Sequence, residues 1–568
     1  MLKIRNRILR TSVRVILFLV LLFAGFLAYF VAAIHISIPQ IKDRSVEKLT
    51  RETVAIDFYK VGHNWLKKSN SGLWEMYLEG DGFERGVING KLTRELAEYQ
   101  EDVFINQIKQ LIPSEHYLNF LKYFVAYFNR HLPQHISDEY AQEIYGVSLS
   151  ASDKYDQLAP KYYRILNYHS AHDIGHALQD KNMTVGCTSF GLRNGKTKDG
   201  KLLIGRNFDF FAGQDFAHNK IVCFTKPKFG NKFMYVTWAG FTGVVSGMND
   251  KGLTVTINAA KSDIPSSAAT PISLLAKEIL QYAGTIEQAY AIAKKRQTFV
   301  SESILIGSAI DKKTASIEKT PTRIDLFEES GEQLICSNHF RGKLFEKDYT
   351  NNKNIVESSS LYRKFRVEEL LGKNRSFSPE EVALILRNQD GLHGDKIGLS
   401  NEKGINQLIA HHSIIFKPEE LLVWVSTSPF QLGEYVCYDL NKIFEEAPGL
   451  NQKKELNEEN RTIAEDPFLK STSYRQFLLF KQLKDYFSFC TKSDFHLVAE
   501  LRFIRAIQEC NPESYLTYQI LGDYYLKIKN TEYAQRAYTK ALTKEVATKK
   551  EADNLIWLIN ELDLNNYR

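Results

Sequence analysis

The chain has 568 residues, of which 44% are apolar and 25% are charged, a usage that excludes a mainly disordered, collagen-like or multi-span membrane protein. The net charge is +6, and five of the basic residues lie within the first fourteen positions, which contain no acidic residue. The rest of the chain is almost neutral, which argues against nucleic acid as a partner.

A membrane segment is predicted at the N-terminus. Residues 1–14 form a basic flank, and Val15–Ile34 is an apolar run without a charge. A helix of this length covers the hydrocarbon core of a bilayer, which is about 30 Å thick. We interpret residues 15–34 as a single-pass signal anchor with a cytoplasmic N-terminus, which places the body on the non-cytoplasmic side, periplasmic or extracellular. The alternatives are a long cleaved signal ending near Ala32-Ala33 and a buried core helix, and basic residues after the span weaken the charge bias.

Two segments with different sequence patterns follow the predicted anchor. Residues 44–186 are predicted to be mostly helical, because stretches such as Leu92–Ile112 and Glu115–Asn129 carry apolar residues at helical spacing. From about Thr184 short β-rich runs alternate with turn-like sequences, and helices are grouped between them. Runs of strands with grouped helices indicate an α+β layered fold, which we assign to residues 187–445.

The C-terminal part is predicted to be helical. The polar stretch 446–465 is expected to be a linker, and residues 466–568 to form helices. Residues 515–548 fit one tetratricopeptide unit, since small and aromatic residues fall at the positions of that pattern. These residues are Tyr518, Leu521, Gly522, Tyr525, Ala534, Tyr538 and Ala541. Such repeats bind peptides on a concave surface, so a protein partner is expected here; an ordinary helical hairpin is the alternative.

Chemistry is predicted around Cys187, which stands at the start of an expected strand. A turn-like Lys198-Asp199-Gly200 follows, and the next expected strand ends in Arg206 and Asp209. Pairing of the two strands brings together a thiol, a guanidinium and a carboxylate. A thiol is a strong nucleophile once deprotonated, and a neighbouring cation or base favours the thiolate. For Cys187 taken alone, a buried structural cysteine is the alternative.

These residues resemble the N-terminal-nucleophile (Ntn) hydrolases of the penicillin acyltransferase-like family (acyl-coenzyme A:6-aminopenicillanic acid acyltransferase), which are related to choloylglycine hydrolases. Gly186 matches the residue before the scissile bond, Cys187 the nucleophile, and Arg206 and Asp209 the Arg-Asn-x-Asp segment. The resemblance implies a four-layer αββα sandwich and self-cleavage between Gly186 and Cys187. It further implies that the new α-amine of Cys187 acts as the base and is held by Asp209, while Arg206 lines the site.

Further segments extend the resemblance. Asn258 matches an asparagine of the oxyanion hole, and Asn338, in Ser-Asn-His-Phe, matches a second active-site asparagine. Arg363 loosely matches a Ser-x-x-Arg segment near the nucleophile and is expected to bind substrate. Upstream, the glycine-spaced stretch 80–90 resembles a segment of the acyltransferase pro-region. Taken singly, the asparagines are explained by turn capping; together with Cys187 they favour an active site.

We therefore expect a membrane-anchored, self-cleaving cysteine hydrolase without a cofactor. It would act on an amide- or ester-linked, lipid-like acyl substrate through an acyl-enzyme on Cys187. The first alternative is an acyltransferase that passes the acyl group to an amine or alcohol. The second is a non-catalytic, membrane-tethered scaffold that holds a partner through its helical repeats.

A histidine cluster offers a competing site. His169, His172 and His176, with Asp173 among them, lie on one face if the segment is helical, and zinc is then the alternative. The spacing does not match the His-Glu-x-x-His pattern, and the chain has no Cys-x-x-Cys pair. We expect no metal site and interpret the cluster as a polar helix beside the cleavage point.

Overall fold

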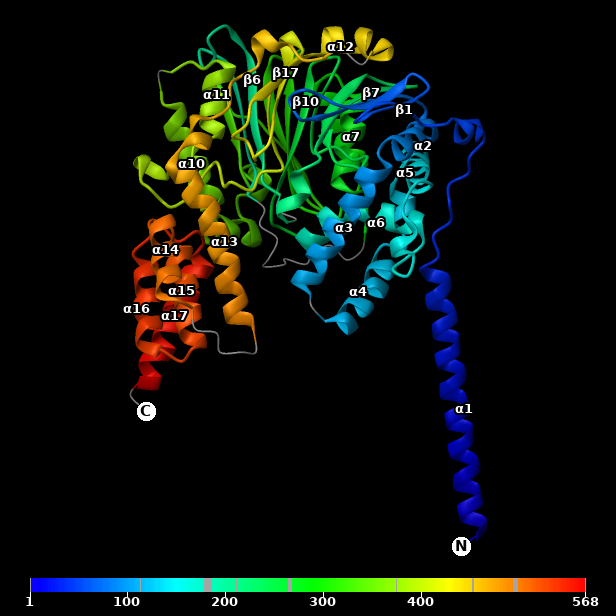
Figure 1. Cartoon of the computed structure of the whole chain (residues 1–568). Coiled ribbons are helices and arrows are strands. Elements are labelled where there is room, and N and C mark those ends of the chain that lie inside the picture. The colour runs from blue at the N-terminus through cyan, green and yellow to red at the C-terminus, as the bar shows by residue number, and fades with distance from the viewer. Residues whose placement is uncertain are drawn as a thin grey trace.

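The fold is taken from a computed structural model, which describes residues 2–112, 114–177, 186–210, 213–263, 268–373, 375–451, 454–493 and 499–566. The body consists of two large β-sheets with helices around them, and helix α1 (Leu2–Ala33) projects away from it (Figure 1). The C-terminal helices lie on the opposite side of the body from α1.

Within helix α1, Thr11–Ala33 is the stretch that fits a membrane. Its mean hydropathy is 2.8 over an apolar window, and none of that window is buried against the rest of the protein. This helix is long and apolar enough to span a bilayer or to serve as a signal sequence.

The larger sheet has eleven strands in the order β1-β2-β3-β4-β7-β8-β9-β10-β11-β12-β13. Their bounds are Glu52–Ala55, Phe58–Val61, Asn64–Lys68, Trp74–Gly80, Ile221–Pro227, Phe233–Thr237, Ser246–Asn249, Leu253–Ala259, Glu302–Ser308, Lys313–Lys319 and Ile324–Phe327. The β4–β7 pair is parallel, and the other pairs are antiparallel. The first four strands therefore join a sheet whose remaining strands all follow Cys187 in the chain.

The prediction of a mostly helical segment 44–186 is wrong for residues 52–80, which form β1 to β4. The physical reason is that β3 and β4 are buried on both faces. Trp65 and Tyr77 enter one core, whereas Leu66 and Leu78 enter the other. Strands of this kind lack the alternation of apolar and polar residues that marks a half-buried strand.

The smaller sheet has six strands in the order β14-β5-β6-β15-β16-β17. Their bounds are Gln333–Cys336, Thr188–Asn194, Gly200–Phe208, His412–Lys417, Leu422–Ser426 and Tyr435–Asp439. Side chains from both sheets form one continuous core, in which Tyr77 and Phe224 of the large sheet share a cluster with Ile414 and Phe416 of the small one. The two sheets therefore pack face to face.

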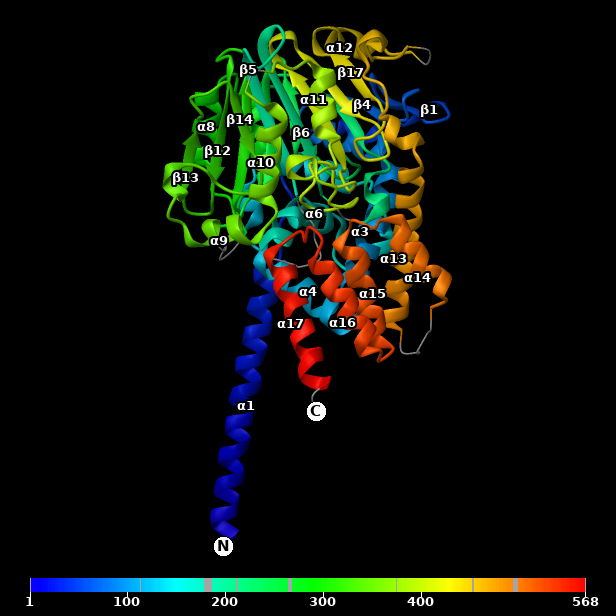
Figure 2. The same cartoon turned by 90° about the vertical axis from the view of Figure 1, so that its left-hand side faces the viewer.

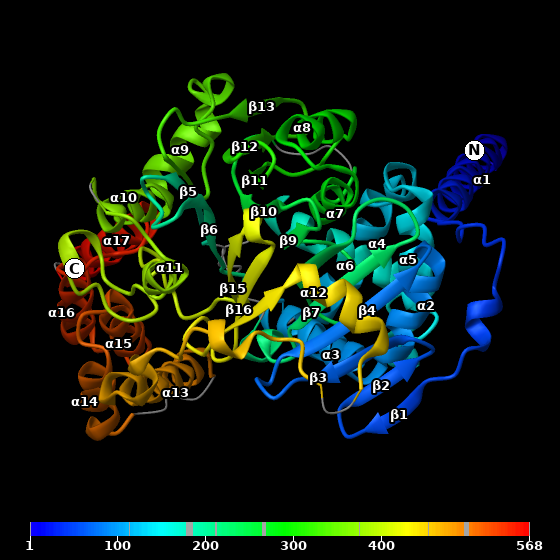
Figure 3. The same ribbon diagram turned by 90° about the horizontal axis from the view of Figure 1, so that it is seen from above.

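Helices cover both outer faces, as the view from above shows (Figure 3). The large sheet packs on α2 (Gly82–Leu92), α5 (Asp138–Ser148), α6 (Lys161–Ala177), α7 (Ile272–Tyr282) and α8 (Ile286–Lys295). The small sheet packs on α10 (Ser360–Leu371) and α11 (Pro379–Leu386). The remaining helices of the body are α3 (Arg94–Leu111), α4 (Glu115–Phe128), α9 (Tyr349–Glu357) and α12 (Leu440–Glu446). The protein is thus a mixed structure of two large sheets flanked by helices.

The glycine-spaced stretch 80–90 has a packing role. Gly82, Gly86 and Gly90 face α5, and a Cβ atom at Gly86 would lie 2.1 Å from the main-chain oxygen of Glu143. Only glycine allows α2 and α5 to approach this closely.

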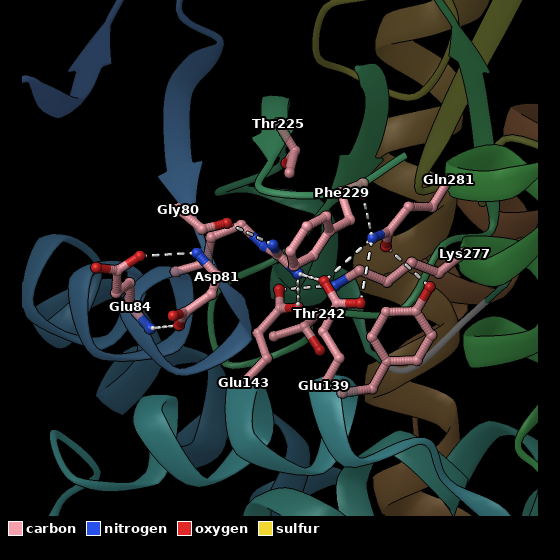
Figure 4. A network of polar contacts seen from close by, with 12 residues as sticks. Gly80, Asp81, Glu84, Glu139, Glu143, Thr225, Phe229, Thr242, Lys277 and Gln281 are labelled. Atoms are coloured by element: carbon pink, nitrogen blue, oxygen red, sulfur yellow. Dashed lines mark hydrogen bonds and ion pairs between the residues drawn. The ribbon is translucent and has the colours of Figure 1, made fainter. Parts of the chain in front are cut away.

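A buried charged network joins α2 and α5 to α7. Arg85 donates to Glu139 and Glu143, each at 2.9 Å, and Lys277 donates to Glu143 at 2.7 Å. Figure 4 shows that Glu139 and Glu143 of α5 and Lys277 and Gln281 of α7 point toward one another. Burial alone would raise the pKa of Glu143, but Arg85 and Lys277 hold it below its usual value. The network connects parts of the chain that precede and follow Cys187.

The stretch 446–465, expected to be a linker, packs on the sandwich. The Trp65 indole donates to the main-chain oxygen of Ala447 at 2.8 Å, and isolated bridges pair Tyr435 with Ile463 and Tyr438 with Asn457. The polar and charged composition suggested a linker, whereas main-chain bridges of this segment extend the edge of the small sheet.

The last part of the chain is helical, as predicted. Its helices are α13 (Thr472–Lys492), α14 (Leu501–Cys510), α15 (Tyr515–Lys527), α16 (Thr531–Leu542) and α17 (Lys549–Asn566). In Figure 2, α14 to α17 lie below α10 and α11. Helices α15 and α16 pack closely because Gly522 faces the ring of Tyr538, where a Cβ atom would lie 2.3 Å away. The assignment of this hairpin to the tetratricopeptide class stays a prediction.

Candidate functional site

Cys187 lies directly before β5, and the β5–β6 pairing brings the predicted partners to it. Ser189 of β5 is opposite Arg206 of β6. The Arg206 Nη2 atom is 3.8 Å from the Cys187 sulfur, and the main-chain oxygen of Asp209 is 4.0 Å from it. All three side chains are buried. The structure thus brings together the thiol, the cation and the carboxylate segment of the predicted hairpin.

The guanidinium of Arg206 is held in place by the large sheet. It donates to the main-chain oxygen of Val245 at 2.9 Å, to the hydroxyl of Ser246 and to the main-chain oxygen of Ile257. Burial raises the pKa of the Cys187 thiol to about 11, and the charge of Arg206 acts in the opposite direction. In the intact chain the sulfur is therefore protonated at neutral pH and needs a base to become a nucleophile.

Asp209 is a fully buried carboxylate. Among the residues that the structure describes, neither carboxylate oxygen has a hydrogen-bond partner. Burial raises the pKa of Asp209 to about 7, although the charges of Arg363 and Arg206 lower it. A carboxylate in this setting can take up a proton near neutral pH or hold an ammonium group.

The two predicted asparagines bridge strands beside Cys187. Asn258 of β10 donates to the main-chain oxygen of Cys336 at 3.0 Å and accepts from the Ser189 hydroxyl at 3.0 Å. Asn338 follows β14 and donates to the main-chain oxygen of Ala259 at 2.8 Å. Because each amide has two N–H groups, each asparagine keeps one donor for another acceptor.

Arg363, the predicted substrate-binding residue, is buried on α10. Its Nη2 atom donates to the Asn338 side-chain oxygen at 2.5 Å, and its Nη1 atom donates to the main-chain oxygen of Glu402 at 2.9 Å. Its charge also acts on the carboxylate of Asp209. In the intact chain Arg363 is therefore part of the polar wall around Cys187.

A residue not predicted from the sequence contacts the Gly186–Cys187 peptide. The side-chain Nε2 atom of Gln407 donates to the main-chain oxygen of Gly186 at 2.7 Å, and both residues are buried. Gln407 lies 221 positions along the chain from Gly186 and outside any regular element. No motif marks it, so only the folded structure reveals the contact.

Of the histidine cluster, the structure describes one side chain, that of His169. Its Nδ1 atom donates to the main-chain oxygen of Ile165 at 2.8 Å, and its Nε2 atom accepts from the main-chain nitrogen of Thr242 at 2.9 Å. Burial lowers the pKa of His169 to about 4. Both ring nitrogens therefore serve the packing of α6, whereas the side chains of His172, Asp173 and His176 lie outside the described residues.

A largely apolar pocket, partly open to solvent, lies next to the segment that carries Asp209. Phe210, which follows Asp209 by one position, forms part of its wall. Aromatic and aliphatic side chains form much of the remainder, among them Phe104, Ile165, Phe216, Trp238 and Phe241. Part of the wall precedes Cys187 in the chain and part follows it, so both segments are needed to form the pocket.

Comparisons with known proteins find one matching family model and one curated relative. Residues 195–426 match the model of one family, acyl-coenzyme A:6-aminopenicillanic acid acyl-transferase. The matched range includes Arg206, Asp209, Asn258, Asn338 and Arg363, and it begins after Cys187. An uncharacterized protein of Archaeoglobus fulgidus is 25% identical over 258 residues, which are 42% of this chain and 41% of that relative. The match thus spans about two fifths of the length of this curated relative.

Solved structures show remote similarity. The Caenorhabditis elegans ortholog of N-acylethanolamine-hydrolyzing acid amidase is 16% identical, with a TM-score of 0.30 over 41% of this chain and 93% of its own. A mutant of conjugated bile acid hydrolase from Clostridium perfringens is 14% identical, with a TM-score of 0.32 over 47% of this chain and 95% of its own. No function follows from likenesses this remote.

Proposed function

We propose that the protein is a self-cleaving cysteine hydrolase of the Ntn class that acts on an acyl amide or ester. The observation that carries the proposal is the buried Cys187 thiol, next to the Arg206 guanidinium and the Asp209 segment. The family match over residues 195–426 supports it. Asn258, Asn338 and Arg363 complete the proposed site.

Self-cleavage comes first. The Cys187 sulfur attacks the carbonyl carbon of Gly186, the C–N bond between the two residues breaks, and the thiol proton passes to the leaving amine nitrogen. The Asp209 carboxylate, with a pKa raised to about 7, suits the transfer of this proton. One water then hydrolyses the thioester, which gives the Gly186 carboxyl group and restores the thiol. The new α-ammonium of Cys187 would supply a hydrogen-bond donor to the buried carboxylate of Asp209, which has none among the residues that the structure describes.

In turnover the same sulfur attacks the substrate carbonyl, and the free α-amine takes the thiol proton. An α-amine has an ordinary pKa of about 8, which suits a general base near neutral pH. The free N–H groups of Asn258 and Asn338 donate to the oxyanion. The leaving amine or alcohol takes a proton from the α-ammonium, and water releases the acyl group from Cys187.

The apolar pocket indicates the class of substrate. Its lining offers a long acyl chain a desolvated wall, and burial of each CH₂ group contributes about 0.8 kcal/mol. The anchor at residues 15–34 keeps the enzyme beside membrane lipids, with the body on the non-cytoplasmic side. Digestion of the body by a protease added to intact spheroplasts supports this topology, whereas protection until lysis reverses it.

The test is hydrolysis of fluorogenic aminocoumarin amides with acyl groups from acetyl to palmitoyl. We expect wild-type protein to prefer long acyl groups and Cys187→Ala to be inactive. Ala97→Phe, at a half-buried pocket position, should lower turnover of the palmitoyl amide and spare the acetyl amide. Activity in Cys187→Ala equal to that of wild type would contradict the proposal.

Transfer to an amine is the second candidate, because the matching family is an acyl-transferase. Both reactions share the acyl-enzyme, and they differ in what attacks it. Addition of a primary amine to the assay distinguishes them: a transferase forms the new amide at the expense of the free acid, whereas a hydrolase keeps releasing the acid. A protein partner at α15 and α16 remains part of the proposal and would be compatible with either reaction.

A further inference from the structure

Residues 397–408 form a loop that contacts the cleavage site on one side and the C-terminal helices on the other. Toward the site, Gln407 reaches Gly186, and the main-chain oxygen of Glu402 accepts from Arg363. Toward the C-terminal helices, Leu399 and Asn511 exchange two hydrogen bonds of 3.0 Å. This loop therefore connects the predicted cleavage site with the C-terminal helices, which were predicted from the sequence as separate regions.

The side chain of Gln407 packs directly against Gly186 and leaves no space for a larger residue at position 186. The main-chain nitrogen of Gly186 donates to the main-chain oxygen of Asp209 at 3.2 Å, which holds Gly186 on its N-terminal side. A Cβ atom at position 186 would lie 2.3 Å from Nε2 of Gln407. Glycine at this position thus permits the amide of Gln407 to reach the carbonyl oxygen.

We propose that Gln407 is a catalytic residue of the self-cleavage step, acting as the donor to the Gly186 oxyanion. The inference rests on the self-cleavage proposed above. When the sulfur of Cys187 attacks the Gly186 carbon, the carbonyl oxygen becomes negatively charged. Nε2 of Gln407 is already 2.7 Å from this oxygen in a buried setting, so it stabilises the charge without reorganisation. The contact also polarises the carbonyl before attack.

The loop is held firmly enough to position such a donor. The main-chain nitrogen of Asn406 donates to the main-chain oxygen of Asn388 at 2.8 Å, and the Asn406 side chain accepts from the main-chain nitrogen of Leu408 at 2.9 Å. Farther along the loop, the side chain of Asn401 donates to the main-chain oxygen of Glu545 at 2.8 Å. The C-terminal helices thus position the loop that carries Gln407.

In the experiment, full-length protein is synthesised in a cell-free system, and its cleavage is followed over time by gel electrophoresis and mass spectrometry. Gln407→Leu preserves the volume and removes the donor, so its cleavage rate constant should fall by about 10²–10³-fold. Gln431→Leu is the matched control: this glutamine is also buried, and toward the described residues its side chain makes one long contact, a donation to the main-chain oxygen of Leu386 at 3.4 Å. Its cleavage should stay within about twofold of wild type, because the residue touches neither Gly186 nor Cys187.

Gln407→Glu gives a readout that a purely structural role would not change. A protonated carboxyl group donates to the Gly186 oxygen, whereas a carboxylate repels it. Cleavage of Gln407→Glu should therefore slow as pH rises through the pKa of the new carboxyl, while wild-type cleavage does not slow. Cleavage of Gln407→Leu at the wild-type rate overturns the role of Gln407 and leaves the proposed function standing. A wild-type chain that never cleaves overturns both.

Discussion

Asn338 donates one N–H to Ala259 and is fixed by Arg363, which leaves its second N–H for the substrate oxyanion. Asn338→Ala should therefore complete self-cleavage, or nearly so, and lose about 10²–10³-fold in turnover. Gel analysis of cleavage and a rate assay on the same preparation separate the two steps. Turnover within a few-fold of wild type would exclude Asn338 as an oxyanion donor.

His169 makes the folded protein sensitive to acid. Its pKa is lowered to about 4 by burial, whereas an unfolded histidine titrates near 6.5, so the unfolded chain binds more protons between these values. This contribution to stability is complete above pH 6.5 and is lost as pH falls toward 4, by roughly 3 kcal/mol in total. Urea unfolding at several pH values should show a smaller loss for His169→Gln. Parallel pH profiles for the two proteins would contradict this account.

At the level of elements, the Arg85 network holds together segments on either side of the cleavage point. Arg85→Leu leaves the buried Glu143 with Lys277 as its remaining cationic partner, and loss of a buried partner costs about 3–5 kcal/mol. The melting temperature should fall, and the two chains of cleaved protein should separate on size exclusion. Lys313→Met, which breaks an exposed pair with Glu328, is the control and should cost less than about 1 kcal/mol. Equal effects of the two variants would show that the network does not join the chains.

The loop at residues 397–408 offers a second element-scale prediction. Asn511→Leu removes both hydrogen bonds to Leu399 at a position remote from the reacting atoms. Self-cleavage should slow about tenfold or less, a smaller effect than that of Gln407→Leu, because the donor is displaced rather than removed. The time course of cleavage in the cell-free system measures this effect. A wild-type time course would mean that the C-terminal helices do not position the loop.

Helices and hairpins whose residues follow a local sequence pattern were predicted correctly. The helices Arg94–Leu111 and Glu115–Phe128 lie within the stretches expected from helical spacing, and the β5–β6 hairpin brought Cys187 to Arg206 as anticipated. Strands β3 and β4 were missed because they are buried on both faces, and β4 pairs with β7 far along the chain. Gln407 was missed for a related reason, since its partner lies 221 positions away and no spacing records that contact.

On the scale of the whole molecule, the segment before Cys187 is an integral part of the fold. It contributes four strands to the large sheet, helices over its outer face and part of the pocket wall. Self-cleavage would therefore leave two chains that remain associated, with α1 on the first chain. In the proposed arrangement a membrane-spanning α1 would hold the pocket and Cys187 near the membrane through non-covalent packing alone.

The central claim is that the chain splits between Gly186 and Cys187 before it acts. Intact mass measurement of purified, active protein tests it most directly. We predict two associated chains, residues 1–186 and 187–568, the second beginning with a free Cys187, whereas Cys187→Ala stays a single inactive chain of about 65 kDa. Wild-type protein that is fully active as one uncleaved chain would contradict the account.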